Sequence, residues 1–463
     1  MTIATEENAQ GAGFTVRLGL FFDGTGNNQS NSELGKERRA SQSHLDGTDD
    51  SYGNDTSNVA HLHALYPDDA RVVLDANAEH AHLKVYLEGI GTRTGQGDAL
   101  YSQATGRWGT GVLARVEQMP ARVLAQLCVL HDHNPGLVIS RIEIDLFGFS
   151  RGAAAARHCA NDLLQGPDSS LARAIPPGTS GFAQGFAWRH PTDLALNFIG
   201  LFDTVAGIVA PLQGDFSANN ALNPGLNLRL APGIARQVVH LVAEHEYRHN
   251  FALTRTDDDL MMPGSHSDIG GGYLPLATER VLLSKPDNSL SPLQVPNEHS
   301  EAHRRTRECL DRELDRWQPY FPGNGLSVFA WDVQTHARTR DTQPEKRVYA
   351  AVAGQRQVRG ELSRVYLQIM HQLAARAGVA FAPDDDRMAL PVELHPIAAK
   401  LRAYALGEPF ERLNAQEHSL LQRHYIHFSA NWNALNGWKT SDLDTLFINR
   451  PGEDNQRTLH PNE

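Results

Sequence analysis

The most informative stretch of the sequence is IDLFGFSRGAAAARH, from Ile144 to His158. It joins an apolar run to an alanine-rich segment through a serine that stands between two glycines. Gly148 and Gly152 flank Ser150 at two positions on either side, which is the G-x-S-x-G pattern. In this pattern the serine occupies the tip of a sharp turn between a strand and a helix, and its small neighbours let other parts of the chain come close. We therefore expect a strand before Ser150, a helix after it, and either a nucleophile or a purely structural turn between them.

The segments around this stretch alternate between strand and helix patterns. Strands are predicted at 16–22, 83–92, 140–149 and 194–202, and helices at 58–67, 112–130 and 151–164. This order favours an α/β fold with a mostly parallel sheet and helices on both faces. We expect it to form a core over residues 14–275.

After residue 275 the alternation of strand and helix patterns ends. Residues 276–463 are expected to form an appended, mostly helical region. Within it, 362–377 has an apolar stripe at helical spacing. Such a stripe usually packs in a core, and the alternative is a lid or a face that docks on a membrane.

Composition places the chain among ordinary globular proteins. Of its 463 residues 41% are hydrophobic and 21% are charged, with a formal net charge of -12 at pH 7. This balance argues against nucleic acid as a partner, because phosphate binding needs clustered Lys and Arg. The 3 cysteines are too few for a disulfide framework or a cysteine-rich zinc site. We expect no Sec signal peptide, since the first residues lack a basic start and an apolar run, and no membrane span.

A serine nucleophile needs a general base, an acid that orients the base, and donors for the oxyanion. Asp203 stands where the apolar strand in LALNFIGLFDTVAG ends, and His266 lies in a glycine-flanked loop further along the chain. Nucleophile, acid and histidine follow in this order in hydrolases that carry this turn. We therefore predict a triad of Ser150, Asp203 and His266. The alternatives that remain open are Asp268 or Asp162 as the acid and His427 as the base.

The oxyanion donors are expected to be backbone N–H groups. One is that of Arg151, directly after the serine, and the other comes from the loop that follows the first strand, at Asp23 or Gly24. The glycine there permits close approach of the backbone to a substrate.

Six motifs strengthen this interpretation: LGLFFDGTGNN, EGIGT, GFSRGAAAAR, GLFDTV, HEYRHNF and PGSHSDIGGGY, in this order between residues 18 and 273. In them the chain resembles the alpha/beta-hydrolase family that includes the Tle1-like phospholipase effectors of the type VI secretion system. The resemblance implies an alpha/beta-hydrolase fold and a serine lipase or phospholipase A that hydrolyses acyl esters of membrane glycerophospholipids. The residues from 276 onward carry no motif of this family.

The resemblance also implies a biological setting. Effectors of this family are made in the cytoplasm, travel with a secretion spike protein into the periplasm of a neighbouring bacterium, and are neutralised there by a cognate immunity protein. Two other functions stay open: a different serine carboxylester hydrolase, and a non-catalytic hydrolase-like module that binds a partner.

A metal site is the competing interpretation. HEYRH, from His245 to His249, matches H-E-x-x-H, in which two histidines one helical turn apart bind zinc. The same stretch coincides with a charged E-x-R-x-x-F element of the family, here Glu246, Arg248 and Phe251, and we expect an ion pair and anchor instead. No metal or other cofactor is expected. Calcium assistance is left open, because DGTGNN offers oxygen ligands but lacks the calcium-loop spacing.

Overall fold

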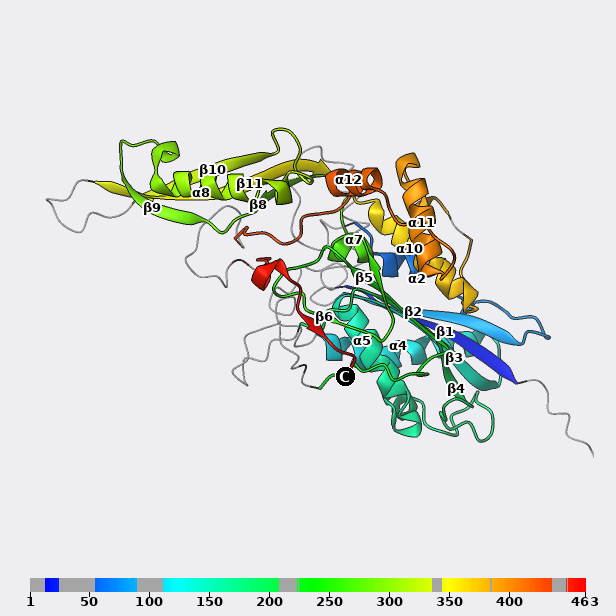
Figure 1. Cartoon of the computed structure of the whole chain (residues 1–463). Helices are drawn as coiled ribbons and strands as arrows, with labels where there is room; N and C mark the ends of the chain where they lie inside the picture. Colours follow the sequence, from blue (N-terminus) through cyan, green and yellow to red (C-terminus); the bar gives the residue numbers. More distant parts are fainter. Residues whose placement is uncertain are drawn as a thin grey trace, which may run out of the picture.

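The computed structural model describes residues 13–24, 55–89, 111–207, 223, 225–334, 344–383, 385–434, 447 and 449–463. Most of the loop DGTGNN and the end of EGIGT lie outside these residues, so the suggested calcium ligands there are not described. Figure 1 shows the arrangement of the elements.

The centre of the molecule is a six-stranded sheet in the order β2-β1-β3-β4-β5-β7. Its strands are β1 Phe14–Phe22, β2 His80–Leu87, β3 Ile139–Phe149, β4 Leu194–Phe202, β5 Gln237–Ala243 and β7 Asp259–Met262. Every neighbouring pair is parallel. Helices cover both faces, so the strands are nearly continuous apolar runs, as buried parallel strands are. The predicted α/β class, with an alpha/beta-hydrolase-like sheet, is confirmed.

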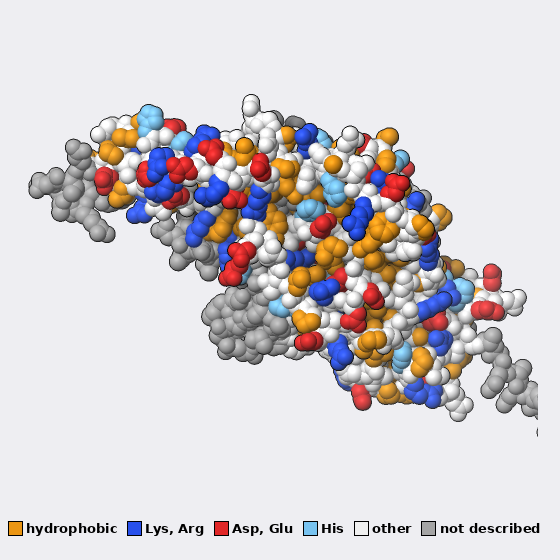
Figure 2. All heavy atoms as spheres, viewed as in Figure 1, with side chains coloured by type: hydrophobic (Ala, Val, Ile, Leu, Met, Phe, Trp, Pro, Cys, Tyr) orange, Lys and Arg blue, Asp and Glu red, His pale blue; other side chains and the backbone are white. Residues whose placement is uncertain are grey.

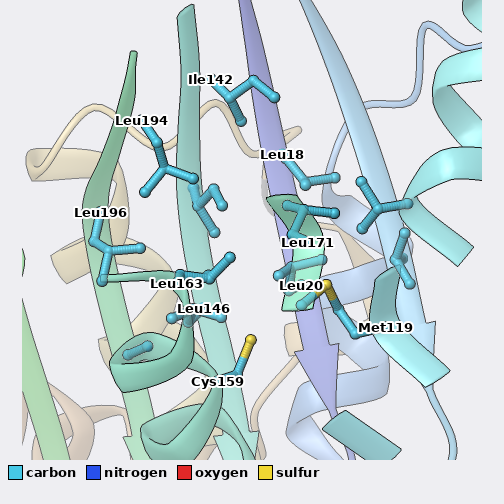
Figure 3. Close-up of a cluster of buried hydrophobic side chains, with 14 of the residues drawn as sticks. Leu18, Leu20, Met119, Ile142, Leu146, Cys159, Leu163, Leu171, Leu194 and Leu196 are labelled. Carbon is cyan, nitrogen blue, oxygen red and sulfur yellow. The ribbon is translucent and has the colours of Figure 1, made fainter. Parts of the chain in front are cut away.

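Two apolar clusters hold the helices onto the sheet. On one face α4 (Val112–His133), α5 (Arg151–Leu163) and α6 (Ser170–Ala174) pack against β1, β3 and β4. Figure 3 shows leucines of these strands meeting Met119 of α4 and Cys159 of α5. On the other face lie α2 (Asn58–Leu65), α7 (His266–Gly270), α10 (Leu362–Arg376), α11 (His395–Ala405) and α12 (Ala415–His424).

The apolar stripe predicted at 362–377 belongs to this second cluster. Its side chains are those of Leu362, Val365, Tyr366, Ile369, Met370, Leu373 and Ala377, none more than 5% exposed. They pack against α2, α7 and the strands β4 and β5. The stripe is therefore core. The alternative of a lid or a membrane-docking face does not fit side chains that are already covered.

Residues 277–358 differ from the expected helical region. They form a second, antiparallel sheet of β8 Ala277–Leu282, β9 Asp287–Pro292, β10 Leu326–Gln334 and β11 Glu345–Val358. The helix α8 (Glu301–Arg312) packs on it, and Figure 1 shows the unit projecting from the main sheet. The mostly helical prediction holds only for 362–424. The strands β9 and β10 are half exposed and partly polar, so they lack the apolar runs that identified the strands of the main sheet.

The C-terminal segment, residues 449–463, lies beside β6 (Leu253–Thr254) and α5 and contributes to a separate two-stranded sheet (Figure 1). Its strand β12 (Leu459–His460) pairs in parallel with β6. The amide of Asn462 exchanges two hydrogen bonds with the backbone of Leu230. The last residues are therefore fixed beside the loops that follow the central strands.

Among the described residues, none of the helices combines the length and apolar character needed to cross a membrane. On the face drawn in Figure 2, basic and acidic side chains are interspersed, and no broad basic field covers it. That face does not resemble a nucleic-acid footprint.

Candidate active site

Ser150 occupies a strained turn between β3 and α5. Its backbone φ is 58° and its ψ is −126°, a conformation that side chains rarely adopt and that recurs at functional sites. The glycines explain how the turn fits. A Cβ on Gly148 would lie 2.6 Å from the Cα of Ala153, and a Cβ on Gly152 would lie 2.2 Å from the carbonyl oxygen of Phe22. The G-x-S-x-G stretch thus forms the strand, turn and helix that its sequence predicts.

Asp203 and His266 meet beside this turn. Asp203 directly follows β4, and His266 is the first residue of α7. Nδ1 of His266 lies 2.5 Å from Oδ2 of Asp203. The backbone N–H of Val205 donates to the carbonyl of Ser150 at 3.4 Å, and the rings of Phe149 and His266 are 4.7 Å apart. The structure therefore brings the three predicted residues to one end of the sheet, where all three are buried.

The alternative residues are engaged elsewhere. Asp268 forms a 2.7 Å contact with Nδ1 of His427, and it caps α7 together with Ser265. Asp162 accepts hydrogen bonds from the backbone and hydroxyl of Ser170. Asp203 is thus the acid bonded to His266, whereas Asp268 is bonded to the alternative base His427. Among the described contacts, only the Asp203 side of this choice adjoins the serine turn, because Ser150 bonds to the backbone of Phe202 and Val205.

An arginine that the sequence analysis missed binds the same carboxylate. Arg457, in the C-terminal segment, donates from its two terminal nitrogens to Oδ1 and Oδ2 of Asp203, at 2.7 and 2.9 Å. The N–H of Ala243 also donates to Oδ1, at 3.0 Å. Burial alone would raise the pKa of Asp203, but the charge of Arg457 and the hydrogen bond to His266 outweigh burial and hold that pKa well below its usual range.

The imidazole of His266 lies in an aromatic cage. The rings of Phe149 and Phe251 are centred 4.7 and 4.9 Å from it. Burial lowers the pKa of His266, although the hydrogen bond to Asp203 opposes this shift. The side chain is therefore neutral at neutral pH, which is the form a general base needs.

The E-x-R-x-x-F element, formed by Glu246, Arg248 and Phe251, supports one of the two rings that contact His266. The side chains of Arg248 and Glu246 form two hydrogen bonds, at 2.8 and 3.0 Å, and the guanidinium of Arg248 stacks 3.3 Å above the ring of Phe251. Burial would raise the pKa of Glu246, but Arg248 lowers it to about 2. Oε2 of Glu246 accepts the backbone N–H of His266 at 3.3 Å. The predicted ion pair is confirmed, and it anchors the histidine.

A second histidine–aspartate pair fixes the loop of the acid. His240 on β5 is fully buried, and its Nδ1 lies 2.8 Å from Oδ1 of Asp259. Its Nε2 accepts the backbone N–H of Thr204 at 3.0 Å. Because Nε2 accepts, Nδ1 carries the proton. This pair positions the residue after Asp203, and nothing in the sequence around His240 marks it.

The structure treats the expected oxyanion donors differently: Arg151 lies at the start of a helix, whereas the N–H groups of Asp23 and Gly24 are already hydrogen-bonded. Arg151 begins α5, where backbone N–H groups point out of the helix terminus. The N–H of Asp23, however, donates to the carbonyl of Leu87 at 3.0 Å and continues the pairing of β1 with β2. The N–H of Gly24 donates to Oδ1 of Asp23 at 2.6 Å. The assignment of Asp23 as a donor is therefore wrong for this geometry, and Gly24 could serve only by releasing its present partner.

The carboxyl of Asp23 has a structural role instead. It accepts hydrogen bonds from the hydroxyls of Tyr86, at 2.5 Å, and Ser57, at 2.8 Å. Ser57 is the N-cap of α2. The carboxyl therefore ties β2 and α2 to the end of β1.

The H-E-x-x-H match does not form a zinc site. His245 and His249 lie in turns and not on a helix, so the spacing that would place both on one face is absent. Nδ1 of His245 accepts the N–H of Gly264 at 3.0 Å. Within the described residues, no group of three or more His, Cys, Asp or Glu side chains has a metal-binding arrangement.

The fold has a close match among solved structures. The chain is similar to the Tle1 effector whose structure was determined bound to the VgrG spike from the type 6 secretion system, with 27% sequence identity and a TM-score of 0.74. The match covers 97% of this chain and 94% of that chain. An uncharacterized protein from Pseudomonas aeruginosa matches at 18% identity and a TM-score of 0.40, over 89% of this chain and 53% of the other. No protein-family model and no curated protein matches.

Proposed function

We propose that this chain, a Tle1-like member of the alpha/beta-hydrolase family, is a serine hydrolase that cleaves acyl esters of membrane glycerophospholipids. The observation that carries the proposal is the 2.5 Å contact between His266 and Asp203 beside the strained turn of Ser150. A nucleophile, a base and an orienting acid are the groups that acyl transfer needs.

Each residue has a defined part in this reaction. Nε2 of His266 takes the proton of the Ser150 hydroxyl as Oγ attacks the acyl carbonyl carbon. Asp203 accepts the hydrogen bond from Nδ1–H, which keeps Nε2 unprotonated in the resting enzyme and stabilises the imidazolium that forms. The backbone N–H of Arg151 donates to the oxyanion, a contribution of about 3 kcal/mol for one such donor.

The second half of the reaction regenerates the serine. His266 returns its proton to the departing alcohol, so lysophospholipid leaves and the acyl group remains on Ser150. Water then gives a proton to His266 and attacks the acyl carbon. The fatty acid departs as Oγ regains its proton.

The substrate class and the setting rest on the family. The Tle1 neighbour was solved on a VgrG spike, and we extend to this chain the role of a secreted effector that travels with a spike protein. Its target is phospholipid reached from the periplasm of a neighbouring cell, and a cognate immunity protein protects the producer. The buried stripe of α10 supplies no membrane contact, so acyl chains must reach the site through other surface.

The test is a product analysis. Purified wild-type protein and its Ser150→Ala variant are incubated with vesicles of defined diacyl phosphatidylethanolamine and phosphatidylglycerol, and the products are weighed by mass spectrometry. We expect fatty acid and lysophospholipid from the wild type and none from the variant. Cleavage of short soluble esters with intact vesicles would indicate a different carboxylester hydrolase, and no cleavage of either would indicate a binding module.

A further inference from the structure

Arg457 reaches the acid of the triad from the far end of the sequence. It is 254 residues from Asp203 and binds both carboxylate oxygens, at 2.7 and 2.9 Å. Its side chain is 7% exposed and that of Asp203 is 0% exposed. A forked arginine on a buried carboxylate is among the strongest and most directional of hydrogen-bonded pairs. Such a contact fixes the plane of the carboxylate as well as its position.

The C-terminal segment holds this arginine in place at several points. Nε of Arg457 donates to the carbonyl of Phe251 at 2.7 Å, and the ring of Phe251 lies against His266. Two residues later, Leu459 begins the pairing with β6. Asn462 accepts a hydrogen bond at 2.9 Å from Arg157, a buried arginine on the helix that follows the Ser150 turn. The segment thus binds Asp203 directly, and it also contacts the helix that follows Ser150 and the residue whose ring lies against His266.

We propose that Arg457 is a positioning residue of the triad, which orients the Asp203 carboxylate for His266 and offsets its charge, so that acyl transfer depends on the C-terminal segment. This inference rests on the proposed function, because it concerns how the triad works. Asp203 with Arg457 is a neutral pair, whereas Asp203 alone would attract a proton onto His266. The arginine therefore favours a neutral His266 over a wider range of pH.

The expected effect follows from this charge balance. Removing Arg457 takes one positive charge away from the Asp203–His266 pair, so protonation of the pair becomes easier and its apparent pKa rises. The acidic limb of the pH–activity profile should then move to higher pH by about one unit. Loss of the fork also lets the carboxylate rotate, and a displaced catalytic group costs up to about 100-fold in kcat.

The experiment compares three full-length variants with the wild type. Arg457→Met removes the charge, Arg457→Lys keeps the charge without the fork, and Arg189→Met is the matched control. Arg189 binds Asp193 through two of its nitrogens, at 2.8 and 3.0 Å, just before β4 begins and hence at the opposite end of the strand from Asp203. The readouts are kcat and kcat/KM for a short soluble ester from pH 4.5 to 9, and the thermal midpoint of unfolding.

Arg457→Met should lose about 100-fold in kcat, and the acidic limb of its pH–activity profile should lie at higher pH. Arg189→Met should keep the wild-type profile. A loss of kcat without a shift of the limb, or wild-type kcat in Arg457→Met, would overturn the inference and leave Arg457 as a structural tether. If Arg457→Met does not fold, Arg457→Lys decides. In this variant the acidic limb of the pH–activity profile should stay in place, but kcat should fall about tenfold. An unchanged kcat would refute the role of the two-point hydrogen bond to Asp203.

The proposed function can fail separately. A wild-type protein that hydrolyses no ester and is not labelled by a fluorophosphonate would defeat the proposed function itself. Activity in the wild type with an unchanged profile in Arg457→Met would defeat only the inference about Arg457.

Discussion

The backbone N–H of Ser150 donates a hydrogen bond to the carbonyl of Phe202, at 3.0 Å. Phe202 is the last residue of β4, and in the sheet it is paired with Phe149. Ser150 and Asp203 are therefore the residues that directly follow two paired positions on adjacent parallel strands. The register of β3 and β4 thus fixes the distance between the candidate nucleophile and the candidate acid, and a shift in that register would separate them.

The choice of acid leads to the first prediction. Asp203→Asn should lower kcat by about 10⁴-fold, because an amide cannot hold His266 in the required tautomer. Asp162→Asn should keep its activity, since Asp162 binds only Ser170 in the described structure. Asp268→Asn should lower the thermal midpoint more than kcat, because it weakens the cap of α7. Near-normal turnover in Asp203→Asn, together with an inactive Asp268→Asn or Asp162→Asn, would reassign the acid.

The second prediction concerns pH. Burial lowers the pKa of His266 below 6.5. A base works when deprotonated, so the midpoint of the acidic limb of kcat/KM should lie below pH 6.5. The profile of kcat/KM for a soluble ester reports this pKa in the free enzyme. A midpoint of the acidic limb at or above 6.5 would contradict the predicted environment of the imidazole.

The third prediction concerns metal. Dialysis against a strong chelator should leave ester hydrolysis unchanged. His245→Ala should cost about 1 to 2 kcal/mol of stability, because the N–H of Gly264 loses its acceptor, with little effect on kcat. Metal analysis and activity are measured on the same samples. One equivalent of zinc in the wild type, lost along with activity in His245→Ala, would revive the zinc-protease interpretation.

The fourth prediction tests the packing of the turn. A methyl group on Gly152 would meet the carbonyl oxygens of Phe22 and Asp23 at 2.2 and 2.4 Å. Gly152→Ala should therefore cost about 3 kcal/mol or more in the free energy of unfolding and abolish turnover. Gly136→Ala is the control: its Cβ meets nothing within 4 Å, and its positive φ alone costs about 1 kcal/mol. Equal melting temperatures for Gly152→Ala and the wild type would show that the contact is not tight.

The parts of the site that could be predicted are marked in the sequence by a short motif or by their order along the chain. The turn at Ser150 is marked by two glycines within two residues, because steric contact at each position excludes a side chain. Asp203 follows an apolar run, and His266 falls third in the order known for this fold, so each could be located without knowing the packing.

The remaining parts depend on contacts between distant segments. Arg457 lies in a polar stretch with no pattern, and it reaches Asp203 through the pairing of β12 with β6 and the hydrogen bonds of Asn462. Asp23 seemed suited to hold an oxyanion, but the ladder between β1 and β2 extends one residue further than its sequence suggests and occupies its N–H. Both outcomes are set by register, and a single sequence does not display register.

The proposed mechanism requires Ser150 as the nucleophile, and covalent labelling probes this requirement without relying on a substrate. The wild type and the Ser150→Ala variant are treated with a fluorophosphonate, and the modified peptide is identified by mass spectrometry. Ser327→Ala, at an exposed position on β10, is the matched control. We expect one adduct, on Ser150, in the wild type and in Ser327→Ala, and no adduct in Ser150→Ala at an unchanged thermal midpoint. Undiminished labelling of Ser150→Ala, or an adduct on another residue of the wild type, would contradict the proposed mechanism.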